Sequence, residues 1–290
     1  MSQTEETLQP AQSEGDPQSI KVLMYHRIVD DRQECKDHWT SVHVQDFRRQ
    51  LEFLDRWGYT AITTEDYLLF RENRLSLPKK PVIITFDDGY LDTYQYAFPL
   101  LREFGMRAIV FVLGDRTVDT NNWDNTIRGI KESPLMDDEQ IIDMHEAGFE
   151  IGAHTMTHAN LPTISEDEAL FEIEASKDGL EDMLDAKIRS FSYPYGLVNE
   201  NAKRIVQDVG FEMAYSVGSG PALFGKDIYE TRRTTIYGRG SLTNFAMKMF
   251  APYQRYEWAR WKAGRAVRMM TGRGDGSSGT QTPLPSQNNI

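Results

Sequence analysis

The sequence predicts an α/β protein in which a parallel sheet closes into a barrel with helices outside. Between residues 20 and 240, short apolar runs rich in β-branched residues alternate with segments of helical periodicity. Strands buried on both faces are typically unbroken apolar runs, and a helix after each one returns the chain for a parallel neighbour. The chain holds about seven such units, which favours a barrel or distorted barrel over a small doubly wound sheet.

Each expected strand is an apolar run, and most are followed by an expected helix. The strands are predicted at Lys21–Tyr25, 82–86, 108–113, 149–153, 190–193 and 214–217, and the helices at 47–57, 92–103, 137–146, Glu166–Leu184 and 200–209. Gly105, Gly148 and Gly210 end three of these helices, since glycine readily adopts the conformation that closes a helix. Ser165 is placed to cap the longest helix.

The chain of 290 residues suits one large domain with appendages. Residues 1–19 and 272–290 are polar and poor in apolar side chains, so we expect both to be disordered. Residues 20–240 are expected to form the main domain. Residues 241–271 are expected to form a basic amphipathic C-terminal helix.

This basic segment differs from the rest of the chain. Residues 241–273 carry seven Lys and Arg side chains against a single Glu, with tryptophans and methionines between them. The simpler interpretation is a helix packed across the barrel with a solvated basic face. The alternative is an interfacial helix that contacts anionic lipid, as basic amphipathic helices with aromatic residues do.

The composition excludes some classes of protein. The net charge of −12 argues against non-specific nucleic-acid binding, which requires a basic face. Cys35 is the only cysteine, so the chain has neither an intrachain disulfide nor a thiolate metal cluster. The sequence shows no signal-peptide pattern and no apolar run long enough to span a bilayer, so we expect a cytoplasmic protein, with possible attachment at the inner membrane face.

Two adjacent carboxylates leave the expected strand at 82–86, in the sequence Thr85-Phe86-Asp87-Asp88-Gly89. An Asp-Asp-Gly tripeptide taken alone is usually a turn. Two carboxylates at the end of an apolar strand are costly, however, unless a positive charge neutralises one of them. A divalent cation would supply that charge.

Two histidines follow the expected strand at 149–153, in the sequence His154-Thr-Met-Thr-His158. With one carboxylate from the first motif they would form a two-histidine, one-carboxylate site, which leaves positions open for water and substrate. The second aspartate is then free to act as a base. In α/β barrels the loops after the strands build the active site, and both motifs lie there.

A third motif, Arg189-Ser-Phe-Ser-Tyr-Pro194-Tyr195-Gly196, in isolation reads as a strand and a turn. The three motifs together, in this order, resemble those of the NodB-type polysaccharide deacetylases of carbohydrate esterase family 4. The resemblance covers roughly residues 20–237. It implies a distorted (β/α) barrel and metal-assisted amide hydrolysis.

The resemblance also implies a role for each matching residue. Asp87 corresponds to the general base, and Asp88, His154 and His158 correspond to the metal ligands. Arg189 would orient Asp87 and keep it ionised. Pro194 and Tyr195 would line the substrate groove, with the Tyr195 backbone N–H in the oxyanion hole. One divalent ion is implied, with zinc as the default and cobalt, nickel, iron or manganese as alternatives.

The general acid departs from the usual family pattern, because no histidine follows His158. The sequence Leu23-Met24-Tyr25-His26-Arg27 instead resembles the circularly permuted subgroup that includes the poly-N-acetylglucosamine deacetylases, in which an N-terminal histidine is the acid. His26 is therefore the expected acid. The family's Asp- and Trp-containing motif is not recognisable, and Arg232 and Arg233 are left without a role.

These observations predict an N-deacetylase acting on an N-acetylated glycan or a lipid-linked sugar. One alternative is a non-haem iron oxygenase, although Asp88 lacks the spacing usual in that class and Asp87 would have no function. Another is a non-catalytic carbohydrate-binding protein of the same fold. A third is a hydrolase of an amide or other C–N bond outside sugars.

Overall fold

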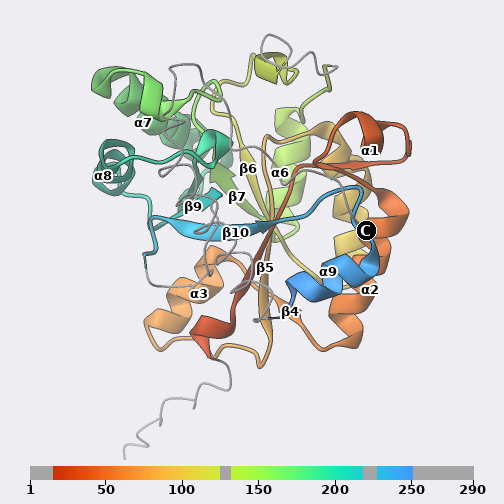
Figure 1. Ribbon diagram of the computed structural model, residues 1–290. Coiled ribbons are helices and arrows are strands. Elements are labelled where there is room, and N and C mark those ends of the chain that lie inside the picture. The colour runs from red at the N-terminus through yellow and green to blue at the C-terminus, as the bar shows by residue number, and fades with distance from the viewer. Residues whose placement is uncertain (1–15, 125–131, 218–226, 251–290) are drawn as a thin grey trace, which may run out of the picture.

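The computed structural model describes residues 16–124, 132–217 and 227–250 (Figure 1). Seven parallel strands form a closed ring in the order β1, β10, β9, β8, β7, β6 and β5, and β5 pairs back with β1. The strands are β1 (Lys21–Tyr25), β5 (Pro81–Phe86), β6 (Ile109–Val112), β7 (Glu150–Ala153), β8 (Ser190–Ser192), β9 (Met213–Val217) and β10 (Thr231–Thr235). The predicted α/β barrel of about seven parallel strands is confirmed.

Three short strands lie outside the ring. β4 (Thr60–Ala61) extends the sheet beyond β5, while β2 (Arg27–Val29) and β3 (Ser41–His43) form a separate parallel pair. These three strands are too short to give an apolar run, and the sequence did not predict them.

Helices surround the barrel (Figure 1). They are α1 (Glu34–Asp37), α2 (Val44–Arg56), α3 (Thr64–Arg71), α4 (Phe98–Glu103), α6 (Asp138–Glu146), α7 (Glu166–Leu184), α8 (Glu200–Asp208) and α9 (Leu242–Lys248). The predicted cap of α7 is confirmed, since the Ser165 hydroxyl accepts from the Glu168 N–H and the Glu168 carboxylate accepts from the Ser165 N–H. The predicted helix at 92–103 begins with a π-helical turn at Thr93–Ala97 before α4.

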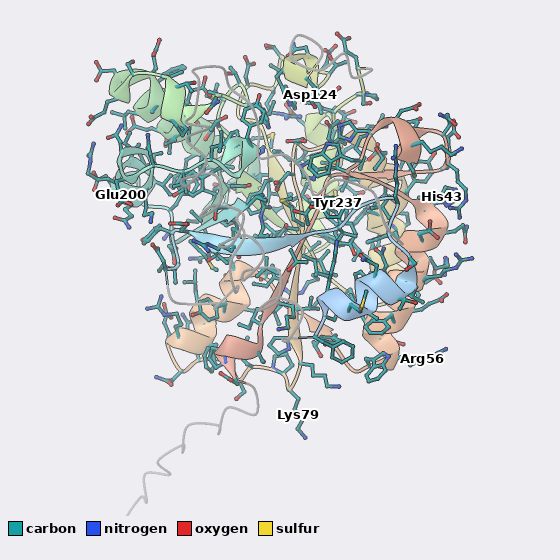
Figure 2. All side chains as sticks on the ribbon, in the orientation of Figure 1. His43, Arg56, Lys79, Asp124, Glu200 and Tyr237 are labelled. Carbon is teal, nitrogen blue, oxygen red and sulfur yellow. The ribbon has the colours of Figure 1, made fainter. Side chains whose placement is uncertain are left out.

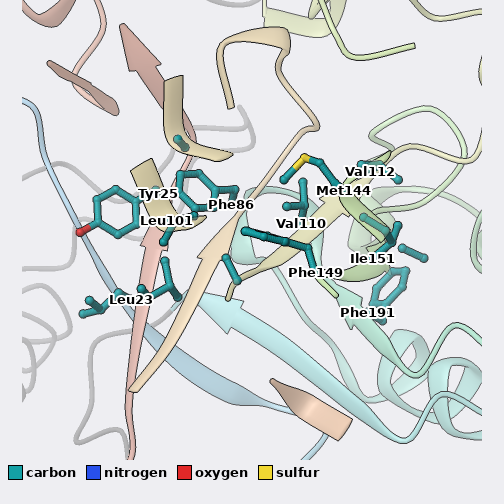
Figure 3. Packing of buried hydrophobic residues seen from close by; sticks show 14 of the residues in the cluster. Leu23, Tyr25, Phe86, Leu101, Val110, Val112, Met144, Phe149, Ile151 and Phe191 are labelled. Carbon is teal, nitrogen blue, oxygen red and sulfur yellow. The ribbon is translucent and has the colours of Figure 1, made fainter. Parts of the chain in front are cut away.

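The main core lies between the barrel and its helices (Figure 3). Phe86, Val110, Ile151 and Phe191 come from four neighbouring strands and are almost fully buried against residues such as Met144 of α6. Burying one side chain of this size stabilises the fold by roughly 1.5–3 kcal/mol. This packing holds the strand ends, and therefore the loops after them, in fixed positions.

The strand that completes the ring, β10, was missed because its sequence is Thr-Arg-Arg-Thr-Thr. Thr231 and Arg233 are buried while Arg232 is partly exposed, so the strand has the alternation of an extended segment but not its usual apolar character. The buried guanidinium of Arg233 makes its hydrogen bonds inside the barrel mouth, as described below.

The predicted C-terminal helix lies mostly outside the described residues, which end at residue 250. Only α9 represents it, and this helix packs beside α2. The expected disordered segments also lie outside, apart from residues 16–19, where Pro17–Ser19 form a 3-10 turn. In the part of the chain that the structure describes, no helix has the combined length and apolarity that crossing a bilayer requires.

Candidate active site

The chemistry-bearing residues meet at the carboxyl ends of the barrel strands. Asp87 follows β5, His26 follows β1 and His154 follows β7. Figure 2 shows that Lys79, just before β5, lies at the end of the molecule opposite Asp124, so the two ends of the barrel are well separated. A parallel barrel gathers its loops in this way because all its strands end on the same side.

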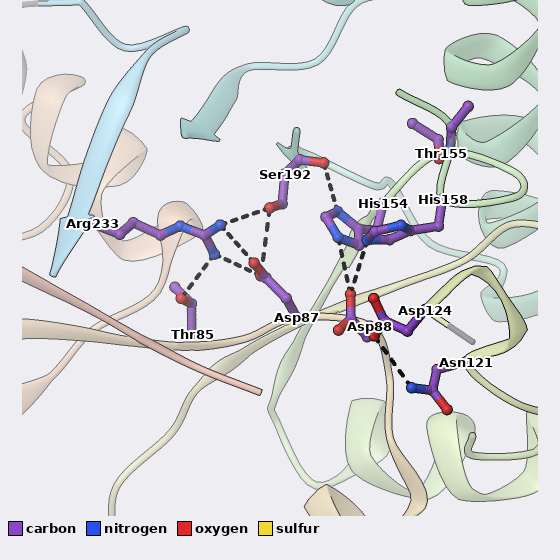
Figure 4. Close-up of polar contacts among 11 residues, drawn as sticks. Thr85, Asp87, Asp88, Asn121, Asp124, His154, Thr155, His158, Ser192 and Arg233 are labelled. Carbon is purple, nitrogen blue, oxygen red and sulfur yellow. Dashed lines mark hydrogen bonds and ion pairs between the residues drawn. The ribbon is translucent and has the colours of Figure 1, made fainter. Parts of the chain in front are cut away.

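Three buried side chains form a group suited to a metal ion (Figure 4). One ligand atom each from Asp88, His154 and His158 lies within 4.8 Å of the others. The Asp88 Oδ1 atom is 3.2 Å from His154 Nε2 and 3.3 Å from His158 Nε2. Among the described residues this buried oxygen has no geometrically acceptable hydrogen bond. A buried carboxylate oxygen facing two imidazole nitrogens fits a divalent cation better than a protein-only contact.

The protonation of His154 is fixed by its second nitrogen. His154 Nδ1 lies 2.7 Å from the carbonyl oxygen of Ser192, which can only accept, so Nδ1 carries a proton and Nε2 is the nitrogen that faces Asp88. Burial would raise the pKa of Asp88, but the adjacent imidazoles of His154 and His158 outweigh it and hold that pKa well below its ordinary value. Asp88 is therefore anionic at neutral pH.

Asp87 lies beside this group but has a different partner. Both of its carboxylate oxygens accept from the Arg233 guanidinium, at 2.6 and 2.7 Å, and the Arg233 side chain is fully buried. Arg233 also donates to the hydroxyls of Thr85 and Ser192. Burial acts to raise the pKa of Asp87, yet the Arg233 charge prevails and that pKa lies below its ordinary value.

The backbone explains why adjacent carboxylates reach different partners. Asp87 continues the extended line of β5, and its N–H donates to the Tyr25 carbonyl of β1. Asp88 then adopts a left-handed conformation, with φ of 72°. This conformation is uncommon outside glycine but is tolerated by Asp. The turn directs Asp88 to the histidines and leaves Asp87 with Arg233.

His26 lies at the same end of the barrel as both aspartates. In β1 and β5, Tyr25 pairs with Phe86, so the next residues, His26 and Asp87, leave the sheet at the same level. The His26 imidazole is close enough to contribute to the low pKa values of Asp87 and Asp88, after the larger contributions given above. Its buried Nδ1 has no hydrogen-bond partner among the described residues.

Two aromatic rings enclose the imidazole of His158, whose Nε2 faces Asp88. The Trp123 ring stacks on it at 4.5 Å, and the Tyr195 ring meets it edge-on at 4.6 Å. Tyr195 belongs to the turn Pro194–Gly196 after β8 and has φ of 59°. A side chain on Gly196 would place its Cβ 2.4 Å from Val217 Cβ, so only glycine fits this turn.

The predicted contact between Arg189 and Asp87 is wrong. Arg189 precedes β8 and therefore lies at the amino end of the barrel, where it pairs with Glu212 at 2.7 Å and Glu65 at 3.5 Å. Arg233, at the level of the mouth, takes the position beside Asp87. The three residues of β8 separate Arg189 from the carboxyl end of the barrel, where Asp87 lies.

Sequence reasoning also missed Trp123 and Asp124. Asp124 is buried, accepts from the Asn121 amide at 3.3 Å, and lies next to Asp88 in Figure 4. The available signal was the length of the connection between β6 and α6, since long loops in compact domains are usually functional.

Comparisons with known proteins agree with this geometry. Residues 74–214 match the family model described as polysaccharide deacetylase. This part of the chain is a polysaccharide deacetylase domain. The predicted enzyme class is thereby confirmed, and the matched residues include Asp87, Asp88, His154 and His158 but neither His26 nor Arg233.

Relatives of the deacetylase support the same assignment. It is 27% identical to YxkH of Bacillus subtilis (strain 168), which is grouped with the polysaccharide deacetylases, over 76% of this chain and 72% of that protein. It is 23% identical to the poly-beta-1,6-N-acetyl-D-glucosamine N-deacetylase of Staphylococcus epidermidis, over 75% of this chain and 79% of that protein. The predicted resemblance to the poly-N-acetylglucosamine deacetylases is confirmed.

Among solved structures, the deacetylase resembles PplD of Streptococcus pyogenes in complex with acetate. The TM-score is 0.69 at 25% identity, over 80% of this chain and 98% of that one. IcaB of Ammonifex degensii has the same fold, with a TM-score of 0.65 at 22% identity over 81% of this chain and 97% of that one.

Proposed function

We propose that the deacetylase is a metal-dependent hydrolase that removes the N-acetyl group from an N-acetylated amino sugar of the GlcNAc type and releases acetate. The observation that carries this proposal is the buried Asp88–His154–His158 group with Asp87 beside it, ionised by Arg233 and separate from the ligand set. Structural metal sites use all their ligands to enclose the ion, whereas three protein ligands with a neighbouring base suit catalysis.

The ligands would be Asp88, His154 and His158. One carboxylate and two imidazoles suit zinc, our default, while cobalt, nickel, iron and manganese can bind the same atoms. When bound, such an ion lowers the pKa of a coordinated water to about 7 and polarises a carbonyl oxygen.

Asp87 would accept the proton of the attacking water. Arg233 keeps the carboxylate ionised and fixes its plane, and each oxygen retains a second lone pair for the incoming proton. Ser192 lies within 3.4 Å of the same carboxylate and adds a further constraint on its orientation.

His26 would act as the general acid. A C–O bond forms at the acetamide carbon and the C–N bond breaks, while the imidazolium of His26 donates its proton to the departing nitrogen. The products are acetate and a free amine. This proton transfer is needed because an amide nitrogen leaves poorly as an anion.

Tyr195 and Pro194 would bind the substrate. The Tyr195 backbone N–H is proposed to donate to the developing oxyanion, and its ring, held against His158, to line the groove with Pro194. The left-handed conformation of Tyr195 is a strained feature of the kind that surrounding structure maintains at functional sites.

The names of the relatives support the substrate class. The Staphylococcus epidermidis protein is a deacetylase of poly-beta-1,6-N-acetyl-D-glucosamine, and PplD was solved with acetate. A glycan or a lipid-linked sugar is therefore the proposed substrate. Lipid contact by residues 241–271 and a cytoplasmic location stay predictions, and liposome flotation with and without that segment tests the former.

Acetate release from a panel of N-acetylated sugars and oligosaccharides, by zinc-loaded and metal-stripped protein, tests the proposal. We expect release by the loaded protein that is lost on stripping and strongly reduced in Asp87→Asn and His26→Ala. Wild type with verified bound metal that releases no acetate from any N-acyl sugar would contradict it. Binding of oligosaccharide without release would instead favour a carbohydrate-binding protein.

A further inference from the structure

The loop that carries both histidine ligands, residues 154–158, has an unfavourable backbone conformation. Thr155 and His158 both have φ of 63°, in the left-handed region. For a β-branched residue such as Thr155 this is a genuine outlier, and each such residue costs of order 1–3 kcal/mol. The loop therefore needs contacts from its surroundings to hold its two imidazoles at the spacing observed.

The sheet side of this loop is held by backbone hydrogen bonds. The Gly114 N–H donates to the Thr155 carbonyl at 2.9 Å, and the Asp115 N–H donates to the Met156 carbonyl at 3.0 Å. These bonds continue the pairing of β6 with β7 beyond the last strand residues. They fix the loop carbonyls but leave the loop N–H groups to be satisfied from elsewhere.

Those N–H groups donate to Glu172 of α7, whose backbone carbonyl also accepts from the Met156 N–H at 3.1 Å. Glu172 Oε2 accepts from the Met156 and Thr157 N–H groups, both at 2.9 Å, and Oε1 accepts from the Thr157 hydroxyl at 2.7 Å. Both oxygens of Glu172 are thus used on the loop between the ligands. Bonds from neutral N–H groups to a charged carboxylate are about twice as strong as neutral pairs.

The helix that presents Glu172 is itself fixed against the strand end. Ser176 lies one turn after Glu172 on the same face of α7. A side chain at Gly114 would place its Cβ 2.5 Å from Ser176 Cα, so the helix backbone packs directly on Gly114, the second residue after β6. Helix, strand end and loop therefore form one rigid unit.

We propose that Glu172 is a positioning residue for the metal site: it holds the 154–158 loop in its strained conformation and thereby sets the spacing of His154 and His158. This inference rests on the proposed function, since it takes the three-residue group to be a metal site. Without the carboxylate, the Thr157 N–H and hydroxyl lose their acceptor, the Met156 N–H keeps only the Glu172 backbone carbonyl, and the loop relaxes. Loss of a partner that orients metal ligands typically weakens metal affinity by 10–100-fold.

The test measures metal binding rather than activity. Zinc affinity is determined by competition with a chromophoric chelator for wild type, Glu172→Ala, Glu172→Gln and Glu174→Ala, and the visible spectrum of the cobalt form is recorded for each. Glu174 is exposed on the same helix and serves as the matched control. We expect affinity to fall by roughly 10–100-fold in Glu172→Ala. The fall should be smaller in Glu172→Gln, which keeps one acceptor oxygen, and absent in Glu174→Ala.

The outcomes separate the two proposals. If wild type binds no zinc, the proposed metal site is contradicted, and with it the proposed function. Wild type that binds zinc while Glu172→Ala binds equally well, with an unchanged cobalt spectrum, overturns only the role of Glu172, even if its melting temperature falls. Should Glu172→Ala fail to fold, the Glu172→Gln affinity decides, and a value equal to that of Glu174→Ala overturns the proposal.

Discussion

The two ends of the barrel each hold a buried or partly buried carboxylate, with different consequences. At the carboxyl end, Asp87 faces the guanidinium of Arg233, and its pKa lies below its ordinary value. At the amino end, Glu150 accepts from the Ser190 hydroxyl and from the N–H groups of Thr64 and Glu65. Burial raises the pKa of Glu150, and the hydrogen bonds from these neutral donors do not outweigh that effect.

The comparison shows that burial alone does not identify a catalytic carboxylate. Glu150 connects the start of α3 to the strands β7 and β8, which is a structural function. Asp87 has a cation, a neighbouring ligand group and the loops of the barrel mouth around it. The charge of the partner and the end of the barrel decide which carboxylate can serve as a base.

The largest expected effect is that of removing the base. Asp87→Asn keeps the shape of the side chain but cannot accept the proton of water, so kcat should fall by about 10²–10⁴-fold. Zinc affinity should stay close to that of wild type, because Asp87 is not among the ligands. Acetate release and zinc titration on the same preparation measure both quantities. A loss of zinc binding as large as that of Asp88→Asn would place Asp87 in the ligand set instead.

The next largest effect concerns the cation beside the base. In Arg233→Gln, burial still raises the pKa of Asp87 but the opposing charge is gone, so that pKa rises. Because the proposed base acts in its ionised form, the acid limb of the kcat/KM profile should move to higher pH, by roughly 1–3 units for the loss of an adjacent charge. Arg189→Gln is the control and should leave that limb in place, since Arg189 contacts Glu212 and Glu65. A shift in the control of the same size would restore the original prediction for Arg189.

The smallest effect should appear at the amino end. Glu150→Ala leaves the N–H groups of Thr64 and Glu65 without their acceptor, which should lower the free energy of unfolding by about 1–3 kcal/mol. The raised pKa means that the folded state holds the proton more tightly than the unfolded chain. The contribution of Glu150 to stability therefore declines as pH rises through the interval just above its ordinary pKa, and the variant should lack this decline. Urea unfolding at several pH values measures both effects. A large fall in kcat for variant protein that is still folded would instead give Glu150 a catalytic role.

Much of the fold could be predicted because the strands β1, β5, β6 and β7 are apolar on both faces and α7 begins with a recognisable cap. The candidate metal ligands Asp88, His154 and His158 could be predicted because their two motifs begin directly after β5 and β7. β10 could not, because its inward side chain is a charged Arg233 whose partner lies 146 positions away in the sequence. Arg189 was predicted to contact Asp87 because of its spacing to Pro194, but the residue that does so is Arg233.

Trp123 and Asp124 illustrate a different difficulty. They lie in a long connection without periodicity, and only the folded chain brings the Trp123 ring onto His158. Nothing in their local sequence indicates which strand end they reach. Contacts of this kind depend on loop geometry rather than on pattern.

Ser192 links the two halves of the active site through separate atoms of one residue. Its carbonyl oxygen selects the tautomer of His154, while its hydroxyl accepts from Arg233 and reaches Asp87. A shift of β8 would consequently disturb ligand and base together, so the two cannot be adjusted independently through this strand. The loops that carry Tyr195 and Trp123 contact only the His158 ring of this group, so a change there leaves the contacts of Ser192 in place.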